Sequence, residues 1–178
     1  MRETIKQIEL FFRSSNFARG IRLGLAIALP FAILYGLGYF EFALPIVIGA
    51  FLNAPGDVPG SRKRKVNAIL ISTGLTMLVT AVILSTKPYL PLLLIAMTVI
   101  SFLVSLLSVY GFRASLVSFS GLLSIVIAFA IEKTTPTEIL VQVAFMGVGG
   151  LWYLTVSLFY QMIFPKKDQN QLLSDILD

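Results

Sequence analysis

The side chains able to do chemistry in this chain are few, and they avoid the middle of its long apolar stretches. The 178 residues include no histidine and no cysteine, which removes the usual general base, the commonest zinc ligand and the thiolate nucleophile. No Asp, Glu, Lys or Arg falls near the centre of an apolar stretch. We therefore expect no enzyme activity, no metal site and no cofactor.

Three arginines and three residues of the last apolar stretch are the candidates for binding a solute. An arginine guanidinium suits bidentate binding of a carboxylate, and a glutamine amide placed in lipid needs hydrogen-bond partners. Aromatic rings can stack on an aromatic solute. Together these groups would attract an organic anion and form an aromatic-lined path for it. The candidates are Arg22, Arg62, Arg113, Gln142, Trp152 and Tyr153.

Helix packing is the competing interpretation of the polar residues inside the apolar stretches. Two hydroxyl stripes at helical spacing are Thr73, Thr76, Thr80 and Ser101, Ser105, Ser108. A third face, within roughly a 100° arc, carries Gln142, Gly149, Gly150, Tyr153 and Ser157. Small and hydroxyl side chains let helix backbones approach closely. We favour packing for the two stripes and for Trp152, whereas for Gln142 and Tyr153 packing and binding stay equally open.

Six apolar stretches must position these residues. A run of about 18 uncharged apolar residues indicates a membrane-spanning helix, because a helix satisfies its own backbone hydrogen bonds in lipid. The mean hydropathy of +0.88 also exceeds that of soluble domains. The predicted fold class is all-α, a polytopic membrane bundle of six transmembrane helices within residues 21–164. The predicted spans are residues 23–40, 41–55, 66–85, 90–110, 114–131 and 139–164.

Two of the stretches fit a single crossing poorly. Residues 42–54 would form a helix of roughly 20 Å, shorter than a hydrocarbon core of about 30 Å. We expect a crossing rather than a re-entrant segment, because a re-entrant segment would put the basic run 62–65 on the outside. Residues 90–131 are too long for one helix. We expect a break at Gly111 beside Arg113, since glycine ends helices and a cation suits a helix C-terminus.

The basic residues are distributed unequally between the two sides of this arrangement. Of the fourteen Lys and Arg residues, only Lys87 and Lys133 fall on one side when the chain crosses six times. The positive-inside rule then places both termini in the cytoplasm. Because membrane topology explains the positive charge, we expect no nucleic-acid partner.

The flanking segments and one loop carry further expectations. Residues 1–20 form a charged, locally amphipathic cytoplasmic segment, expected either to lie against the lipid headgroups or to be a plain solvated leader. Residues 165–178 look like the start of a cytoplasmic helix that is cut short, with an apolar stripe that suggests a fragment or contact with another subunit. The loop containing Asp57, Pro59 and Gly60 is turn-forming.

Four short motifs and the tail together resemble one known family. The motifs are Arg19–Leu23, Asp57–Ser61, Tyr110–Arg113 and Gly149–Tyr153, and the tail is Phe164–Leu173. In order and spacing they resemble the N-terminal membrane module of the fusaric-acid-resistance-like (FUSC) proteins, particularly the YccS-like branch. The aromatic acid exporters belong to the same broad grouping.

The resemblance implies a multi-pass transport module of the bacterial inner membrane that exports organic, often aromatic, carboxylates or related small molecules. Typical family members are longer, with a cytoplasmic domain and a second six-helix module. The alternative is therefore a non-transporting anchor or half-pore that works only by oligomerisation or with these missing domains. The expected partners are the lipid bilayer, a small organic anion and a second copy of the chain, with a homodimer favoured.

Overall fold

The computed structural model describes residues 15–57, 62–133 and 135–163, and all regular secondary structure of these residues is helical. The expectations for residues 1–14 and 164–178, and for Pro59 and Gly60, lie outside the described residues. The helices are α2 (Ser15–Gly36), α3 (Phe40–Asn53), α4 (Arg62–Thr86), α5 (Leu90–Leu106), α6 (Phe112–Ala130) and α7 (Pro136–Ile163), with short 3-10 turns η1 (Ala54–Gly56) and η2 (Leu107–Tyr110).

Four helical segments are long and apolar enough to cross a membrane by length and composition. They are Arg62–Thr86, Leu90–Tyr110, Phe112–Ala130 and Pro136–Met162. The apolar helical segments Gly20–Gly36 and Phe40–Gly56 are shorter. The fold is therefore an all-α bundle with four candidate membrane spans and two shorter apolar helices.

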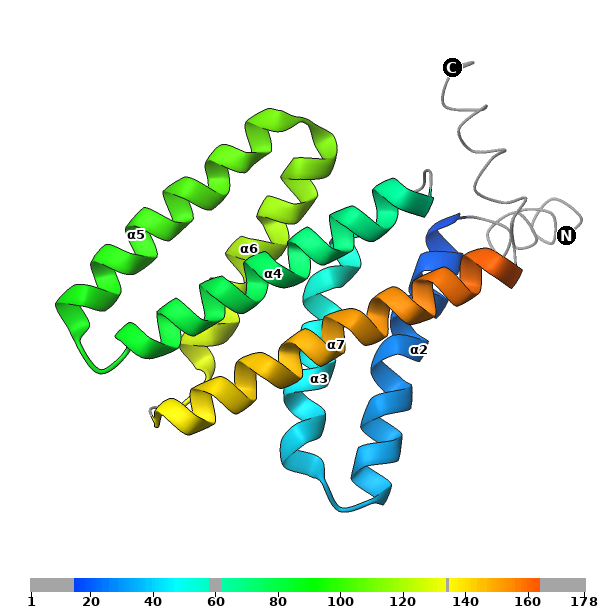
Figure 1. Cartoon of the computed structure of the whole chain (residues 1–178), viewed down its shortest axis with the longest axis horizontal. Coiled ribbons are helices and arrows are strands. Elements are labelled where there is room, and N and C mark those ends of the chain that lie inside the picture. The colour runs from blue at the N-terminus through cyan, green and yellow to red at the C-terminus, as the bar shows by residue number, and fades with distance from the viewer. Residues whose placement is uncertain (1–14, 58–61, 134, 164–178) are drawn as a thin grey trace, which may run out of the picture.

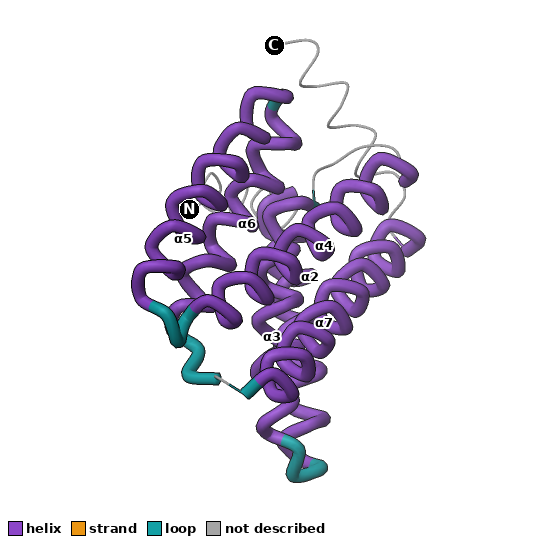
Figure 2. The backbone as a smooth tube through the Cα atoms, turned by 60° about the vertical axis from the view of Figure 1, so that its left-hand side comes forward, coloured by secondary structure: helices purple, strands orange, loops and turns teal. Residues whose placement is uncertain are grey.

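Helix α4 lies at the centre of the bundle. It packs against α6 on one side and α7 on another, while α3 crosses α7 and α2 packs on α3 (Figure 1). Helix α5 lies at the edge, where most of its surface is exposed. The end where α4 and α6 begin and α7 finishes is called here the basic end, and the α2–α3 and α4–α5 turns lie at the opposite end (Figure 2).

Glycines allow α3 and α7 to cross at very short distance. A Cβ atom on Gly49 would fall on the backbone carbonyl of Met146, and a Cβ on Gly149 would fall on that of Ile46. A Cβ on Gly150 would meet Thr73 of α4. The small residues predicted to favour close packing on α7 therefore do so against both α3 and α4.

Two groups of buried apolar residues complete the interior. The larger one, called here the large apolar cluster, is Val79, Ile83, Leu84, Leu93, Val104, Ile125, Ala128 and Ile139. The smaller one is Ala26, Ala50, Ile69 and Tyr153, where α2, α3, α4 and α7 meet. Since most members of the large apolar cluster belong to the far halves of α4, α6 and α7, it fills the interior toward the opposite end.

The break between α5 and α6 lies where the sequence analysis placed it. Gly111 has a φ of 110°, a left-handed conformation that glycine adopts without a steric penalty. Arg113 is the second residue of α6, so the expectation that it marks a helix C-terminus is wrong. The short η2 turn ends the preceding helix before the cation is reached.

Candidate functional site

Asp57 lies at the centre of a buried cluster of charged and hydroxyl groups near the basic end. Lys65 Nζ is 2.7 Å from Asp57 Oδ1, and Arg22 Nη1 is 3.3 Å from Asp57 Oδ2. The Tyr153 hydroxyl donates to Oδ2 at 3.1 Å, and Ser157 Oγ donates to the same oxygen at 2.9 Å. We call these five residues the Asp57 cluster. All five are almost completely buried.

The five residues of the cluster come from four parts of the chain. Asp57 follows the 3-10 turn η1, which continues α3 and whose Pro55 has no backbone N–H to lose. Lys65 comes from the first turn of α4, and Arg22 from α2. Tyr153 and Ser157 are four residues apart on α7 and therefore lie one above the other on the same face.

The cations and hydroxyls around Asp57 keep it ionised. Burial raises the pKa of this carboxyl, but the charges of Lys65 and Arg22, together with hydrogen bonds from Lys65 and Ser157, outweigh burial and lower the pKa below its ordinary value of 3.8. Arg22 also lies over the ring of Tyr160, 4.9 Å from its centroid, a cation–π arrangement. The cluster thus brings two cations and one carboxylate together out of contact with solvent.

An apolar cavity of about 470 Å³ adjoins the cluster. Its lining residues are Gly20, Leu23, Phe51, Ala54, Pro55, Phe119, Leu123 and Tyr153. Tyr153 belongs to both features, because its ring lines the cavity while its hydroxyl binds Asp57. A solute with an apolar or aromatic body and an anionic end fits this arrangement.

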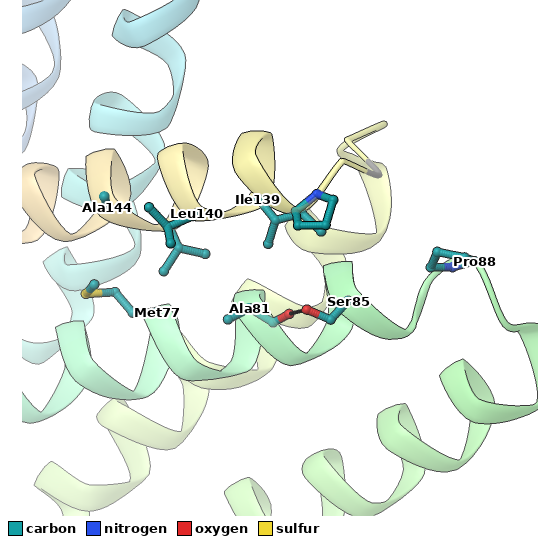
Figure 3. Close-up of a pocket in the computed structure, with 9 residues that line it drawn as sticks. Met77, Ala81, Ser85, Pro88, Ile139, Leu140 and Ala144 are labelled. Carbon is teal, nitrogen blue, oxygen red and sulfur yellow. Dashed lines mark hydrogen bonds between the residues drawn. The ribbon is translucent and has the colours of Figure 1, made fainter.

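A larger groove, of about 610 Å³, lies between α4 and α7 toward the opposite end (Figure 3). It is lined mainly by apolar side chains such as Met77, Leu140 and Ala144. The hydroxyl of Ser85, which also lines the groove, donates a hydrogen bond to the backbone carbonyl of Ala81 at 2.7 Å. No residue of the Asp57 cluster lines this groove, whereas Tyr153 lines the smaller cavity. We therefore place the candidate solute site at the smaller cavity beside the Asp57 cluster, despite its smaller volume.

Two of the six residues predicted to form a solute path come together in the structure. Arg22 and Tyr153 both contact Asp57, although 131 positions separate them in the sequence. Gln142 is buried on the same face of α7 as Tyr153, but eleven residues of helix place it about 16 Å further along the axis. It therefore does not belong to the Asp57 cluster.

The other three predicted residues are not members of the Asp57 cluster. Arg62 is exposed on the first turn of α4, and Arg113 is half-buried in the first turn of α6. Trp152 is half-buried, and its indole Nε1 has no hydrogen-bond partner among the described residues. Its neighbour Tyr153 points into the bundle instead.

Sequence reasoning missed the role of Lys65. The run 62–65 was interpreted as a uniform basic anchor, yet Arg62, Lys63 and Arg64 are exposed and only Lys65 is buried. The available signal was helical spacing, because Lys65 precedes Ile69 by four residues and Ser72 by seven. Asp57 was assigned to a structural loop and not to a binding site.

Comparison with known proteins identifies the family. The family described as FUSC-like inner membrane protein yccS matches residues 68–178. No curated protein and no solved structure shows significant similarity to the chain. The matched region includes Arg113, Gln142 and Tyr153 but begins after Arg22 and Asp57. Since it covers more than half of the sequence and includes apolar helices long enough to span a bilayer, the chain belongs to the FUSC-like family of transport-related inner-membrane proteins.

Proposed function

We propose that the chain is a multi-pass transport module of a bacterial inner membrane that moves organic carboxylates out of the cytoplasm. The observation that carries this proposal is the buried Arg22, which Asp57 binds together with Tyr153, while Tyr153 and Leu23, the residue after Arg22, line the apolar cavity. A guanidinium beside an aromatic-walled cavity matches the two halves of an aromatic carboxylate. Neither the guanidinium nor the aromatic wall has to take part in covalent chemistry to bind such a solute.

Six crossings with both termini in the cytoplasm form the topological part of the proposal. Segments Gly20–Gly36 and Phe40–Gly56 are each 17 residues long, about 25 Å as a helix, so each can cross with local thinning of the bilayer. The basic end then faces the cytoplasm, since it carries Arg62, Lys63 and Arg64 as exposed cations.

The geometry of the Asp57 cluster suggests how an anion would be captured. Lys65 holds Asp57 Oδ1 at 2.7 Å, whereas Arg22 lies 3.3 Å from Oδ2. The shorter contact is the stronger one. An incoming carboxylate would therefore replace Asp57 on Arg22, while Lys65 keeps Asp57 in place. The apolar part of the solute would occupy the cavity between Phe51, Phe119 and the ring of Tyr153.

Uptake into inverted membrane vesicles tests this function. Vesicles containing the chain should accumulate a radiolabelled aromatic carboxylate faster than vesicles without it. Arg22→Gln and Arg113→Ala should each reduce the rate strongly at equal expression. Lys133→Ala, which removes a cation at the opposite end, should leave it unchanged. Equal uptake with and without the chain would reject the proposal, and normal uptake in Arg113→Ala would remove Arg113 from the path.

A second candidate function is a half-pore that works only when paired with another copy. The observation that favours it is the segment Leu90–Tyr110, formed by α5 and η2, which exposes Ser105 and Ser108 together with most of its apolar surface. Hydroxyls on a membrane helix can hydrogen-bond across a helix interface. We propose a homodimer as the assembled state. Mass measurement in nanodiscs tests it, with a dimer expected and a monomer contradicting the half-pore.

A further inference from the structure

We propose that the buried hydroxyl face of α4 holds a short column of water that begins beside the Asp57 cluster and stops at the large apolar cluster. This inference concerns the interior of the bundle and does not depend on the identity of any transported solute.

The first observation is the run of hydroxyl residues on the inner face of α4. Ser72, Thr73, Thr76 and Thr80 are all almost completely buried. Two of them are satisfied by protein groups: Thr73 Oγ1 donates to Asn53 Oδ1 at 3.0 Å or to the Ile69 carbonyl at 2.8 Å, and Thr76 Oγ1 donates to the Thr73 carbonyl at 3.0 Å. Hydroxyl groups therefore follow one another along about two turns of the helix.

The second observation is that two hydroxyls of this face lack a protein partner. Among the described residues, neither Ser72 Oγ nor Thr80 Oγ1 has a hydrogen-bond partner, although both side chains have 0% exposure. A buried hydroxyl without a partner is costly, and a buried water molecule is the ordinary means of satisfying such a group. Both groups lie in line with the satisfied hydroxyls, so waters there would extend one hydrogen-bonded column.

The column connects to the charged end of the interior. Ser72 packs against the connector before Asp57, since a Cβ on Gly56 would lie 3.8 Å from Ser72 Cβ. Asn53, at the end of α3, links Thr73 to the Gly49 carbonyl by donating to it at 2.8 Å. Polar groups thus extend without a long gap from the Asp57 cluster to the middle of α4.

The column ends where the side chains become apolar. Ile83 and Leu84, one turn beyond Thr80, have 0% exposure and pack with Leu93, Ala128 and Ile139 in the large apolar cluster. These side chains give water nothing to hydrogen-bond. The interior is therefore hydrated from the basic end only and closed toward the opposite end.

Single cysteines on α4 test the inference, because the chain has no native cysteine. Thr76→Cys, Thr80→Cys, Ile83→Cys and Leu84→Cys are each made in the full chain, and the rate of N-ethylmaleimide labelling is measured in native membranes. The first two should label at least about tenfold faster than the last two, because the thiolate is the reactive form and apolar burial suppresses it. Equal rates at all four positions, fast or slow, would overturn the proposal.

A second measurement does not depend on cysteine variants folding well. Thr80→Val replaces the hydroxyl by a methyl group of the same shape, and Thr80→Ser keeps the hydroxyl. If water binds Thr80, Thr80→Val should melt at a lower temperature than both wild type and Thr80→Ser. A melting temperature equal to or above that of wild type would show that the hydroxyl is unsatisfied, which would overturn the proposal.

Discussion

Lys65 and Asp57 form an ion pair of 2.7 Å whose two side chains are almost completely buried. The pair joins the end of the α3–η1 segment to the first turn of α4. Asp57 is also bound by Arg22 of α2 and by Tyr153 and Ser157 of α7. One carboxylate therefore ties α2, α4 and α7 to the α3–η1 segment beside the candidate solute cavity.

Replacing Asp57 should strongly destabilise the bundle. In Asp57→Asn the charges of Lys65 and Arg22 remain buried without their carboxylate. The free energy of unfolding should therefore fall by about 3–5 kcal/mol. The measurement is chemical unfolding in detergent micelles. Glu41→Gln is the matched control, since Glu41 is an exposed carboxylate at the far end of α3, and it should change stability by less than about 1 kcal/mol. A similar effect of both variants would contradict the central role of Asp57.

Acidification should destabilise the wild-type chain through the same residue. The pKa of Asp57 is lower in the folded chain than its ordinary value of 3.8. The contribution of ionised Asp57 to the stability of the folded chain is therefore complete above pH 3.8. This contribution is lost as the pH falls below 3.8 through the pKa of Asp57 in the folded chain. Melting temperatures measured between pH 6 and pH 2 should fall more steeply for wild type than for Asp57→Asn. Parallel curves would show that Asp57 does not contribute to the acid sensitivity.

An alanine at Gly149 should disrupt the crossing of α3 and α7. Its Cβ would fall on the backbone carbonyl of Ile46, which cannot move aside as a side chain can. We expect the free energy of unfolding to fall by about 1–3 kcal/mol or more. Gly74→Ala is the control, because that helical position has open space around it. This variant should raise the free energy of unfolding by about 0.5–1 kcal/mol. The two variants should shift the unfolding midpoint in opposite directions, and equal shifts would argue against the close crossing.

The sequence allowed prediction of the helical class, the break at Gly111 and the buried face of α7 that carries Gly149 and Tyr153. These features depend on local properties: charge-free length, glycine conformation and helical periodicity. The Asp57 cluster could not be predicted in the same way. Its members come from four separate segments, and whether Lys65 points inward depends on how α4 is rotated against α7. The basic run by itself carries almost no information on that rotation, and the only signal was the helical spacing of Lys65 to Ile69 and Ser72.

Labelling at position 64 tests the orientation of the basic end. Arg64 is exposed on the first turn of α4, and Arg64→Cys would be the only thiol in the chain. An impermeant maleimide should label it in inverted vesicles but not in intact spheroplasts. Labelling from outside intact spheroplasts would contradict the six-crossing arrangement with the basic end in the cytoplasm.

The central claim is that Arg22, held by Asp57 beside the apolar cavity, binds an organic anion. Its most direct test is equilibrium binding of a radiolabelled aromatic carboxylate to the chain in nanodiscs. Saturable binding is predicted for wild type and for Lys133→Gln, with a loss of about tenfold or more in affinity for Arg22→Gln, since a charged hydrogen bond contributes about 1.5–3 kcal/mol. Melting curves would verify that Arg22→Gln is folded. Absence of saturable binding to wild type, or equal affinity in folded Arg22→Gln, would contradict the account.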